Sequence, residues 1–181
     1  ACLRKPPAFE RVEAAWRYDF PLDALITRFK HQAQWPLGRL LGELLSHHLQ
    51  HTFSEGLAKP DVLLAVPLSS RRLRLRGFNQ AQMLARWLGH SLQLPVTEHL
   101  LQRTQDTPAQ QKLSAAERKR NLLQAFQLGD PHAVAGRHVA LVDDVLTTGA
   151  TAEAIARVLK KAGAARVDVY CLARTPSPGE H

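Results

Sequence analysis

Hydrophobic and polar positions change period within the stretch from residue 139 to residue 162. Four apolar or small residues at 139–142 are followed by Asp143 and Asp144, two further apolar residues and a small, hydroxyl-rich turn at 147–151. Apolar residues then recur at three- and four-residue intervals up to Ala162, which is the period of an amphipathic helix. We therefore expect a buried strand, an acidic pair at its carboxyl end, a tight turn and the beginning of a helix.

The same two patterns alternate along most of the chain. Short apolar runs predict further strands, and helical spacing of apolar residues predicts the helices between them. The expected strands are 12–18, 62–66, 96–101, 125–128 and 166–172, and the expected helices are 19–32, one beginning at Pro36, 79–92 and 115–123. Strands that alternate with helices are typical of an α/β fold with a central, mostly parallel sheet flanked by helices.

The composition is that of a folded protein with an anionic partner. The 181 residues suffice for one domain, or for one domain with a small appendage, and 45% of them are hydrophobic. No apolar run is long enough to span a membrane. The two cysteines, Cys2 and Cys171, cannot form a disulfide framework, so we expect a cytoplasmic protein in which Cys171 is a buried small hydrophobe. The formal net charge of +8 favours polyphosphate, nucleic acid or both as partners.

The acidic pair and the turn after it form a candidate binding site. In an open parallel sheet, ligands bind just beyond the carboxyl ends of the strands. The turn at 147–151 offers backbone N–H groups, hydroxyls and the start of a helix to a phosphate. Carboxylates beside such a turn are suited to sugar hydroxyls or a divalent cation. The pattern favours ribose 5-phosphate as the ligand, and the alternative is a plain strand–turn–helix with solvated acids.

A strongly basic segment follows the strand at 62–66, at the same expected edge of the sheet. It contains four arginines between Pro67 and Gly77. Arginine is suited to bidentate contacts with phosphate oxygens. The segment therefore predicts a second phosphate-binding loop, with a solvated basic loop as the alternative.

The polar connection at 103–112 has no helical or strand period. It is followed by a capping box, in which Ser114 and Glu117 mark the beginning of the helix at 115–123. A polar loop on the ligand side of a sheet is either a lid that excludes water from the site or an ordinary surface loop. The lid candidates are Arg103, Thr107, Gln110 and Arg118.

The stretch at 139–151 resembles the phosphoribosyl diphosphate (PRPP) signature of type I phosphoribosyltransferases. The resemblance implies that the acids contact the ribose 2′- and 3′-hydroxyls, that the turn wraps the 5′-phosphate and that the basic segment cradles the pyrophosphate. The implied ribose 5-phosphate site is Asp143, Asp144, Thr147, Thr148, Gly149, Ala150 and Thr151. The implied pyrophosphate loop contains Pro67, Leu68, Ser69, Ser70, Arg71, Arg76 and Gly77. The implied catalytic residues are Asp143, Asp144 and Arg76.

The chain as a whole resembles the ComF/GntX group of phosphoribosyltransferase-like proteins. The residues that carry this resemblance are Lys30, Arg76-Gly-Phe-Asn-Gln80, Thr107-Pro-Ala-Gln110, Leu113, Arg118, Asn121, Ala125-Phe126 and the signature. Members of the group are associated with natural competence and with the use of DNA as a nutrient. The resemblance implies a type I phosphoribosyltransferase fold, with a remnant of a zinc module and a small helical hood in residues 1–55 and a core in residues 56–181.

Full-length members of this group usually begin with a four-cysteine zinc module. Cys2 is implied as the last ligand of that module, and the other three cysteines are absent from the sequence. Since one cysteine cannot make a tetrahedral site, zinc is expected only where the rest of the module is present.

The function implied by the resemblance is binding of PRPP with Mg²⁺ and transfer of the phosphoribosyl group to or from a nitrogenous base. This would be a glycosyltransferase of the pentosyl class. Two alternatives stay open, namely a non-catalytic sensor of PRPP or a nucleotide and a DNA-binding competence accessory. The expected partner is PRPP or a nucleotide, and single-stranded DNA, DNA-uptake proteins and a second copy of the chain stay open as further partners.

Overall fold

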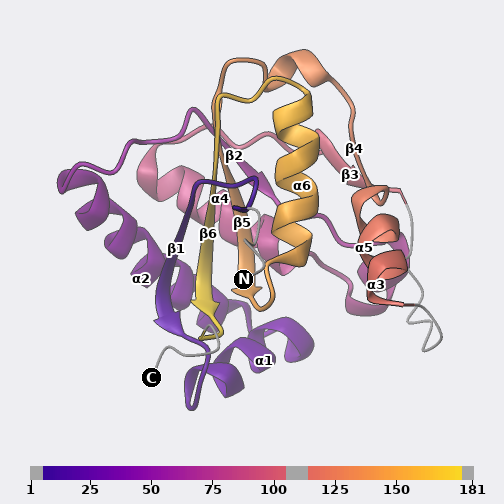
Figure 1. Cartoon of the computed structure of the whole chain (residues 1–181). Coiled ribbons are helices and arrows are strands. Elements are labelled where there is room, and N and C mark those ends of the chain that lie inside the picture. Colours follow the sequence, from indigo (N-terminus) through magenta and orange to yellow (C-terminus); the bar gives the residue numbers. More distant parts are fainter. Residues whose placement is uncertain (1–5, 105–113, 177–181) are drawn as a thin grey trace, which may run out of the picture.

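A parallel four-stranded sheet forms the centre of the molecule (Figure 1). The structure, a computed structural model, describes residues 6–104 and 114–176. The strand order is β1-β6-β5-β2, and each neighbouring pair is parallel. The strands are β1 (Arg11–Arg17), β2 (Val62–Ala65), β5 (His138–Leu146) and β6 (Arg166–Arg174). The predicted α/β class with a mostly parallel central sheet is confirmed.

Helices cover both faces of the sheet (Figure 1). One face packs against α1 (Leu22–Gln32), α2 (Trp35–Ser54) and α4 (Gln80–Leu92). The other packs against α6 (Ala150–Lys161) and a smaller unit of α5 (Ala115–Leu123), β3 (Leu101–Arg103) and β4 (Phe126–Leu128). The remaining elements are α3 (Ser70–Arg76) and a single 3₁₀ turn, η1 (Pro131–Ala133).

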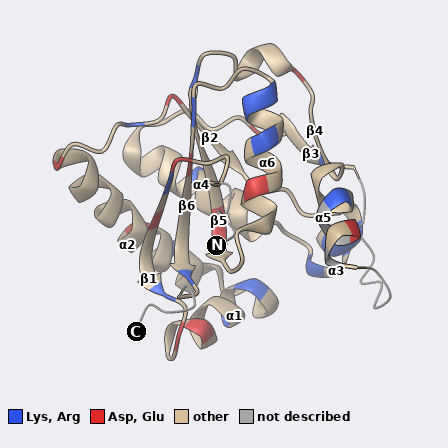
Figure 2. Ribbon diagram, viewed as in Figure 1, with Lys and Arg blue, Asp and Glu red and all other residues tan. Residues whose placement is uncertain are grey.

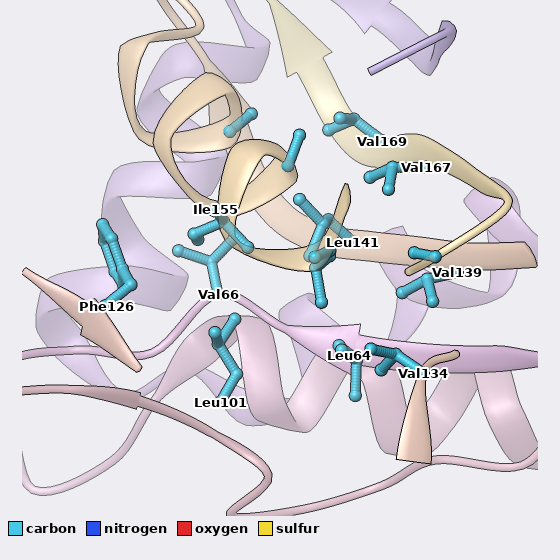
Figure 3. Packing of buried hydrophobic residues seen from close by; sticks show 14 of the residues in the cluster. Leu64, Val66, Leu101, Phe126, Val134, Val139, Leu141, Ile155, Val167 and Val169 are labelled. Carbon is cyan, nitrogen blue, oxygen red and sulfur yellow. The ribbon is translucent and has the colours of Figure 1, made fainter. Parts of the chain in front are cut away.

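The strand before the acidic pair is apolar without alternation because both of its faces are buried. Val139 and Leu141 face the cluster that contains Ile155 of α6, as Figure 3 shows. Ala140 and Val142 face the opposite cluster, which includes the helices α1, α2 and α4. This central strand therefore holds the acids at a fixed position at its carboxyl end.

The basic segment after β2 is a short helix rather than the predicted loop. The Ser69 hydroxyl accepts the Arg72 N–H and caps α3. Gly77, with φ +82°, closes the helix in the left-handed region, where glycine carries no Cβ penalty. No residue of α3 is buried, and Leu75 is 79% exposed. The helix has no apolar stripe, which is why hydrophobic periodicity does not predict it.

The strand predicted at 96–101 is wrong over most of its length. Val96 makes only an isolated parallel bridge with Leu63. His99 then turns the chain in the left-handed region, at φ +64°. The strand β3 follows and pairs antiparallel with β4, outside the central sheet. The apolar residues of this run belong to two different places, because Val96 lies beside β2 and Leu101 begins β3. The run therefore resembles one strand in the sequence although it is interrupted in the structure.

The predicted boundary at residue 55 crosses a shared sheet and a shared core. Strand β1 pairs with β6 along its length, and Leu45 and Leu49 of α2 pack in the same cluster as Leu84 of α4 and Leu172 of β6. The division into 1–55 and 56–181 stays a prediction. Within the described parts of the chain, no helix is both long enough and apolar enough to cross a membrane.

Candidate functional site

A cleft of about 340 Å³ opens at the carboxyl ends of β2 and β5. Its walls come from α1, from the residues that follow β2 and from the turn that follows β5. In Figure 1, α1 lies across this end of the sheet, and Figure 2 shows Lys and Arg on α1 and α3 and acidic residues at the end of β5. The predicted sheet edge is thus where charged side chains from distant parts of the chain converge.

Asp144 is buried and fully engaged by donors. It is 3% exposed, and its Oδ2 atom lies 3.0 Å from Lys30 Nζ and 3.3 Å from Gln80 Nε2. Its Oδ1 atom accepts the N–H of Val145 at 2.9 Å. A buried carboxylate requires such partners, because an unpaired charge inside a protein is costly.

Gln80 joins Asp144 to the basic segment. Its Oε1 atom accepts a hydrogen bond from Arg76 Nη1 at 2.5 Å. Because a guanidinium has only donors, the oxygen of the Gln80 amide must face Arg76 and its NH₂ group must face Asp144. Arg76, Gln80, Asp144 and Lys30 therefore form one continuous polar chain along the cleft.

Asp143 differs from its neighbour. Its side chain is half-buried and lines the cleft, and it accepts the backbone N–H of Asp144 at 2.8 Å. Burial, together with the charge of Asp144, raises the pKa of Asp143 well above its ordinary value. Both acids line the cleft, but their environments are unequal, because Asp144 is paired with Lys30 and Asp143 makes no ion pair among the described residues.

The turn after β5 is held at both ends. The Thr175 hydroxyl donates to the Thr147 carbonyl at 3.1 Å, and Gly149 adopts φ +73° just before α6 begins. Thr147 and Thr151 line the cleft. Thr148, Gly149 and Ala150 form the bend between these two positions, with the Thr148 hydroxyl accepting the Ala150 N–H. Their predicted role toward a 5′-phosphate stays a prediction.

The predicted pyrophosphate loop is only partly in the cleft. Pro67, Leu68 and Arg76 line it, together with Arg72. Ser69 caps α3, while Ser70 and Gly77 line a neighbouring groove and Arg71 is exposed to solvent. The helical form of this segment explains the division, since successive side chains on a helix point in different directions.

The lid candidates are mostly outside the described residues. Arg103 lines the cleft, with its guanidinium 5.6 Å from the centre of the Phe126 ring. Thr107 and Gln110 lie outside the described ranges, as does the side chain of Arg118. The capping box is present as predicted, and α5 begins at Ala115.

The sequence predicted a helical hood in residues 1–55 but gave no role in the site to Gln80, to Lys30 or to any other single residue of α1. Lys30 and Gln80 were part of the family resemblance only. On α1, Ile26 and Lys30 are four residues apart, as are Thr27 and His31, and all four line the cleft together with Tyr18. The only local signal was the helical spacing of the polar residues Thr27, Lys30 and His31, which is also typical of a solvated helix face.

Comparison with known proteins identifies the fold and the group. A model of the phosphoribosyl transferase domain family matches residues 58–181. The chain belongs to this family. The predicted type I phosphoribosyltransferase fold is thereby confirmed, together with the parallel sheet that carries the signature at the end of β5.

The relatives of this phosphoribosyltransferase-family chain are named for DNA utilisation or for competence. It is 42% identical over 175 residues to the DNA utilization protein YhgH of Escherichia coli K12, covering 96% of the chain and 76% of that protein. It is 37% identical to competence protein F of Haemophilus influenzae over the same shares. The predicted resemblance to the ComF/GntX group is confirmed.

The similarity to solved structures is weaker. A purine phosphoribosyltransferase from Pyrococcus horikoshii aligns with a TM-score of 0.47 and 20% identity, covering 78% of each chain.

Proposed function

We propose that the protein binds PRPP together with Mg²⁺ and transfers the phosphoribosyl group to or from a nitrogenous base, in support of DNA utilisation. One observation carries the proposal: the acids at the end of β5 and the arginines of α3 face a single cleft. A ligand with sugar hydroxyls between two phosphate groups matches this order of charges. The names of the relatives supply the link to DNA.

The donor set fits the metal that the family implies. Mg²⁺ prefers oxygen ligands and is commonly held by one or two carboxylates plus the phosphates of a substrate. Asp143, which lines the cleft, is such a carboxylate, and no group of three or more acidic, histidine or cysteine side chains that could hold an ion by itself occurs among the described residues. When bound, Mg²⁺ would supply neutralising charge to the pyrophosphate.

The chemistry assigned to the chain is positioning and electrostatic stabilisation. In the transfer reaction, the bond from ribose C1 to the pyrophosphate oxygen breaks, a bond from C1 to a nitrogen of the acceptor forms, and the nitrogen loses a proton. Negative charge accumulates on the departing pyrophosphate. Arg72 and Arg76 are placed to stabilise that charge, while Asp143 orients the ribose hydroxyls.

The deciding experiment is calorimetric titration with PRPP, with and without Mg²⁺. We expect saturable binding that is tighter with Mg²⁺, and loss of that binding in the double variant Asp143→Asn, Asp144→Asn. The matched control, Glu43→Gln with Glu55→Gln, removes two exposed carboxylates, one on α2 and one directly after it, and should leave binding intact. Unchanged affinity in the aspartate variant would refute the site. Measuring pyrophosphate release from PRPP in the presence of candidate bases then distinguishes an enzyme from a PRPP or nucleotide sensor, because a sensor would release none.

A second function is favoured by the surface outside the cleft. Arg71 and Arg74 of α3 are exposed and do not line the cleft, so their charge is open to a larger anion. If single-stranded DNA binds here, its affinity falls with salt, and Arg71→Ala with Arg74→Ala reduces the logarithmic salt slope by about 0.7 per lost phosphate contact. PRPP affinity should not change in this variant. An unaltered salt slope would exclude α3 as the DNA-binding surface.

A further inference from the structure

Lys30 reaches the acidic pair from a helix whose position is fixed by packing. Leu22, Ile26 and Phe29 bury one face of α1. The Phe29 ring lies 5.9 Å from Phe78 and 6.0 Å from Trp87, measured between ring centres. The ring also occupies the space beside Gly38 of α2 that a side chain would fill. Lys30 therefore extends from a rigid base and not from a mobile surface helix.

The ammonium of Lys30 and the carboxylate of Asp144 form a partly desolvated ion pair. Their side chains are 29% and 4% exposed, and the two charged atoms are 3.0 Å apart. Gln80 donates to the same oxygen, and Val145 N–H donates to the other one. Asp144 thus has a positive partner from the chain itself, supported by two neutral donors.

This arrangement disfavours a second cation at Asp144. Two cations on one carboxylate oxygen repel each other, and the repulsion is stronger where water is partly excluded. Asp143 lines the same cleft but makes no ion pair among the described residues, and its carboxylate accepts the Asp144 backbone N–H. The acidic pair consequently offers one carboxylate that Lys30 already neutralises and one acid that has no cationic partner among the described residues.

We propose that Lys30 is the internal counter-ion of Asp144 and supplies there the positive charge that a divalent cation would otherwise bring. A cation in the cleft is directed to Asp143 and to the oxygens of the phosphorylated ligand. Lys30 thereby sets how strongly ligand binding depends on the metal. The inference rests on the proposed function only for the identity of that ligand. Lys30 and a divalent cation compete for Asp144 whether or not the ligand is bound.

The first test uses Mn²⁺ alone and no ligand, with free Mn²⁺ measured by electron paramagnetic resonance. Lys30→Met should bind Mn²⁺ at least about tenfold more tightly than the unaltered protein, a typical size for coupling between two sites. Lys59→Met is the matched control, because Lys59 is an exposed lysine beside Phe53 and does not line the cleft. It removes the same net charge and should leave Mn²⁺ affinity unchanged.

Two further variants locate the effect. Lys30→Arg keeps the positive charge and should bind Mn²⁺ as weakly as the unaltered protein does. Combining Lys30→Met with Asp144→Asn should abolish the gain. Circular dichroism verifies folding, and Lys30→Gln replaces Lys30→Met if the latter does not fold. Equal Mn²⁺ affinity with and without Lys30, or a gain as large in Lys59→Met, would overturn the proposal.

A PRPP titration completes the test and separates this inference from the proposed function. In Lys30→Met, PRPP affinity should decrease more without Mg²⁺ than with saturating Mg²⁺, because the metal compensates for the lost ammonium. An equal decrease in PRPP affinity with and without Mg²⁺ would show that the metal does not compensate for the ammonium of Lys30. Absence of PRPP binding by the unaltered protein would refute the proposed function, whereas the Mn²⁺ comparison would still decide the role of Lys30.

Discussion

Gln80 shows how one uncharged side chain ties the basic segment to the acidic pair. Its amide hydrogen-bonds to Arg76 on one side and to Asp144 on the other, and the residue is 3% exposed. Replacing it with leucine keeps most of the volume but leaves two charged groups with one partner fewer. We expect Gln80→Leu to lower the free energy of unfolding by about 1–3 kcal/mol.

Urea denaturation measures this loss, with Gln50→Leu as the control on the exposed face of α2. The control should change the free energy of unfolding by less than about 0.5 kcal/mol. If both variants are equally stable, Gln80 is not a structural link between the two segments.

Asp143 provides a pH-dependent prediction. Burial and the charge of Asp144 raise its pKa in the folded protein above the value in the unfolded chain. A carboxyl group with a raised pKa stabilises the fold when protonated, and this stability is lost as pH increases through the folded-state pKa. Asp143→Asn should therefore increase the melting temperature at neutral pH, and the gain should disappear as pH falls toward the unfolded-state value.

The control for this prediction is Asp19→Asn, which removes an exposed carboxylate and should show no such gain. Melting curves of both variants between pH 4 and pH 8 make the comparison. A lower melting temperature for Asp143→Asn at pH 8 would show that the ionised carboxylate is stabilised by contacts that outweigh its burial. The same substitution should weaken PRPP binding, so stability and function would change in opposite directions.

The residues of the site differ in how far the sequence indicates them. Asp143, Asp144 and the turn to Thr151 are contiguous, so their pattern alone places them at a strand end. Lys30 and Gln80 contact Asp144 from α1 and α4. Residues so far apart in the chain leave no sign of their contact in the local sequence pattern. Cys171, predicted to be a buried small hydrophobe, is fully buried in β6, and burial raises the pKa of its thiol to about 12.

At the level of elements, the packing of α1 on α2 depends on a missing side chain. A Cβ atom at Gly38 would overlap the Phe29 ring, whereas a Cβ atom at Gly42, one turn later, would lie 3.4 Å from Leu84 and Trp87. Gly38→Ala should therefore cost about 1–3 kcal/mol of folding free energy through overpacking. It should also weaken PRPP binding, because Phe29 precedes Lys30 on α1.

Gly42→Ala is the matched control on the same helix. The added Cβ atom would lie at an ordinary contact distance from its neighbours, and alanine has a higher helix propensity than glycine. We therefore expect Gly42→Ala to be neutral or to stabilise the fold by up to about 1 kcal/mol. Thermal or urea unfolding of the two variants compares them directly. Equal stabilities would show that Phe29 moves aside without cost and that α1 is less firmly held than its packing indicates.

The elements themselves were predictable where hydrophobic burial determines them. The helices α4, α5 and α6 and the strands β1, β5 and β6 lie within a few residues of their predicted ranges, because each packs on a continuous core. The helix α3 was not predicted, since a capping serine and a terminal glycine define it without any buried face. The run at 96–101 was misassigned because a turn at His99 interrupts it.

For the whole molecule, the shared core bears on the predicted division at residue 55. A fragment of residues 56–181 would lack β1, α1 and α2 and would leave only α4 to cover the sheet face that carries Val142, Tyr170 and Leu172. We expect it to lack a cooperative thermal transition and to bind a hydrophobic dye. The intact chain should unfold cooperatively and should not bind the dye. A cooperative transition in the fragment would instead support a separate core domain.

The position of β1 in the sheet also has a consequence for the order of events during synthesis. Strand β1 is synthesised well before β6, the strand with which it pairs in the central sheet. Contacts between such distant segments form slowly, because a long loop must close before they are made. Strand β1 therefore cannot take its place in the sheet until β6 has been synthesised, and the sheet that carries the cleft is completed late in folding.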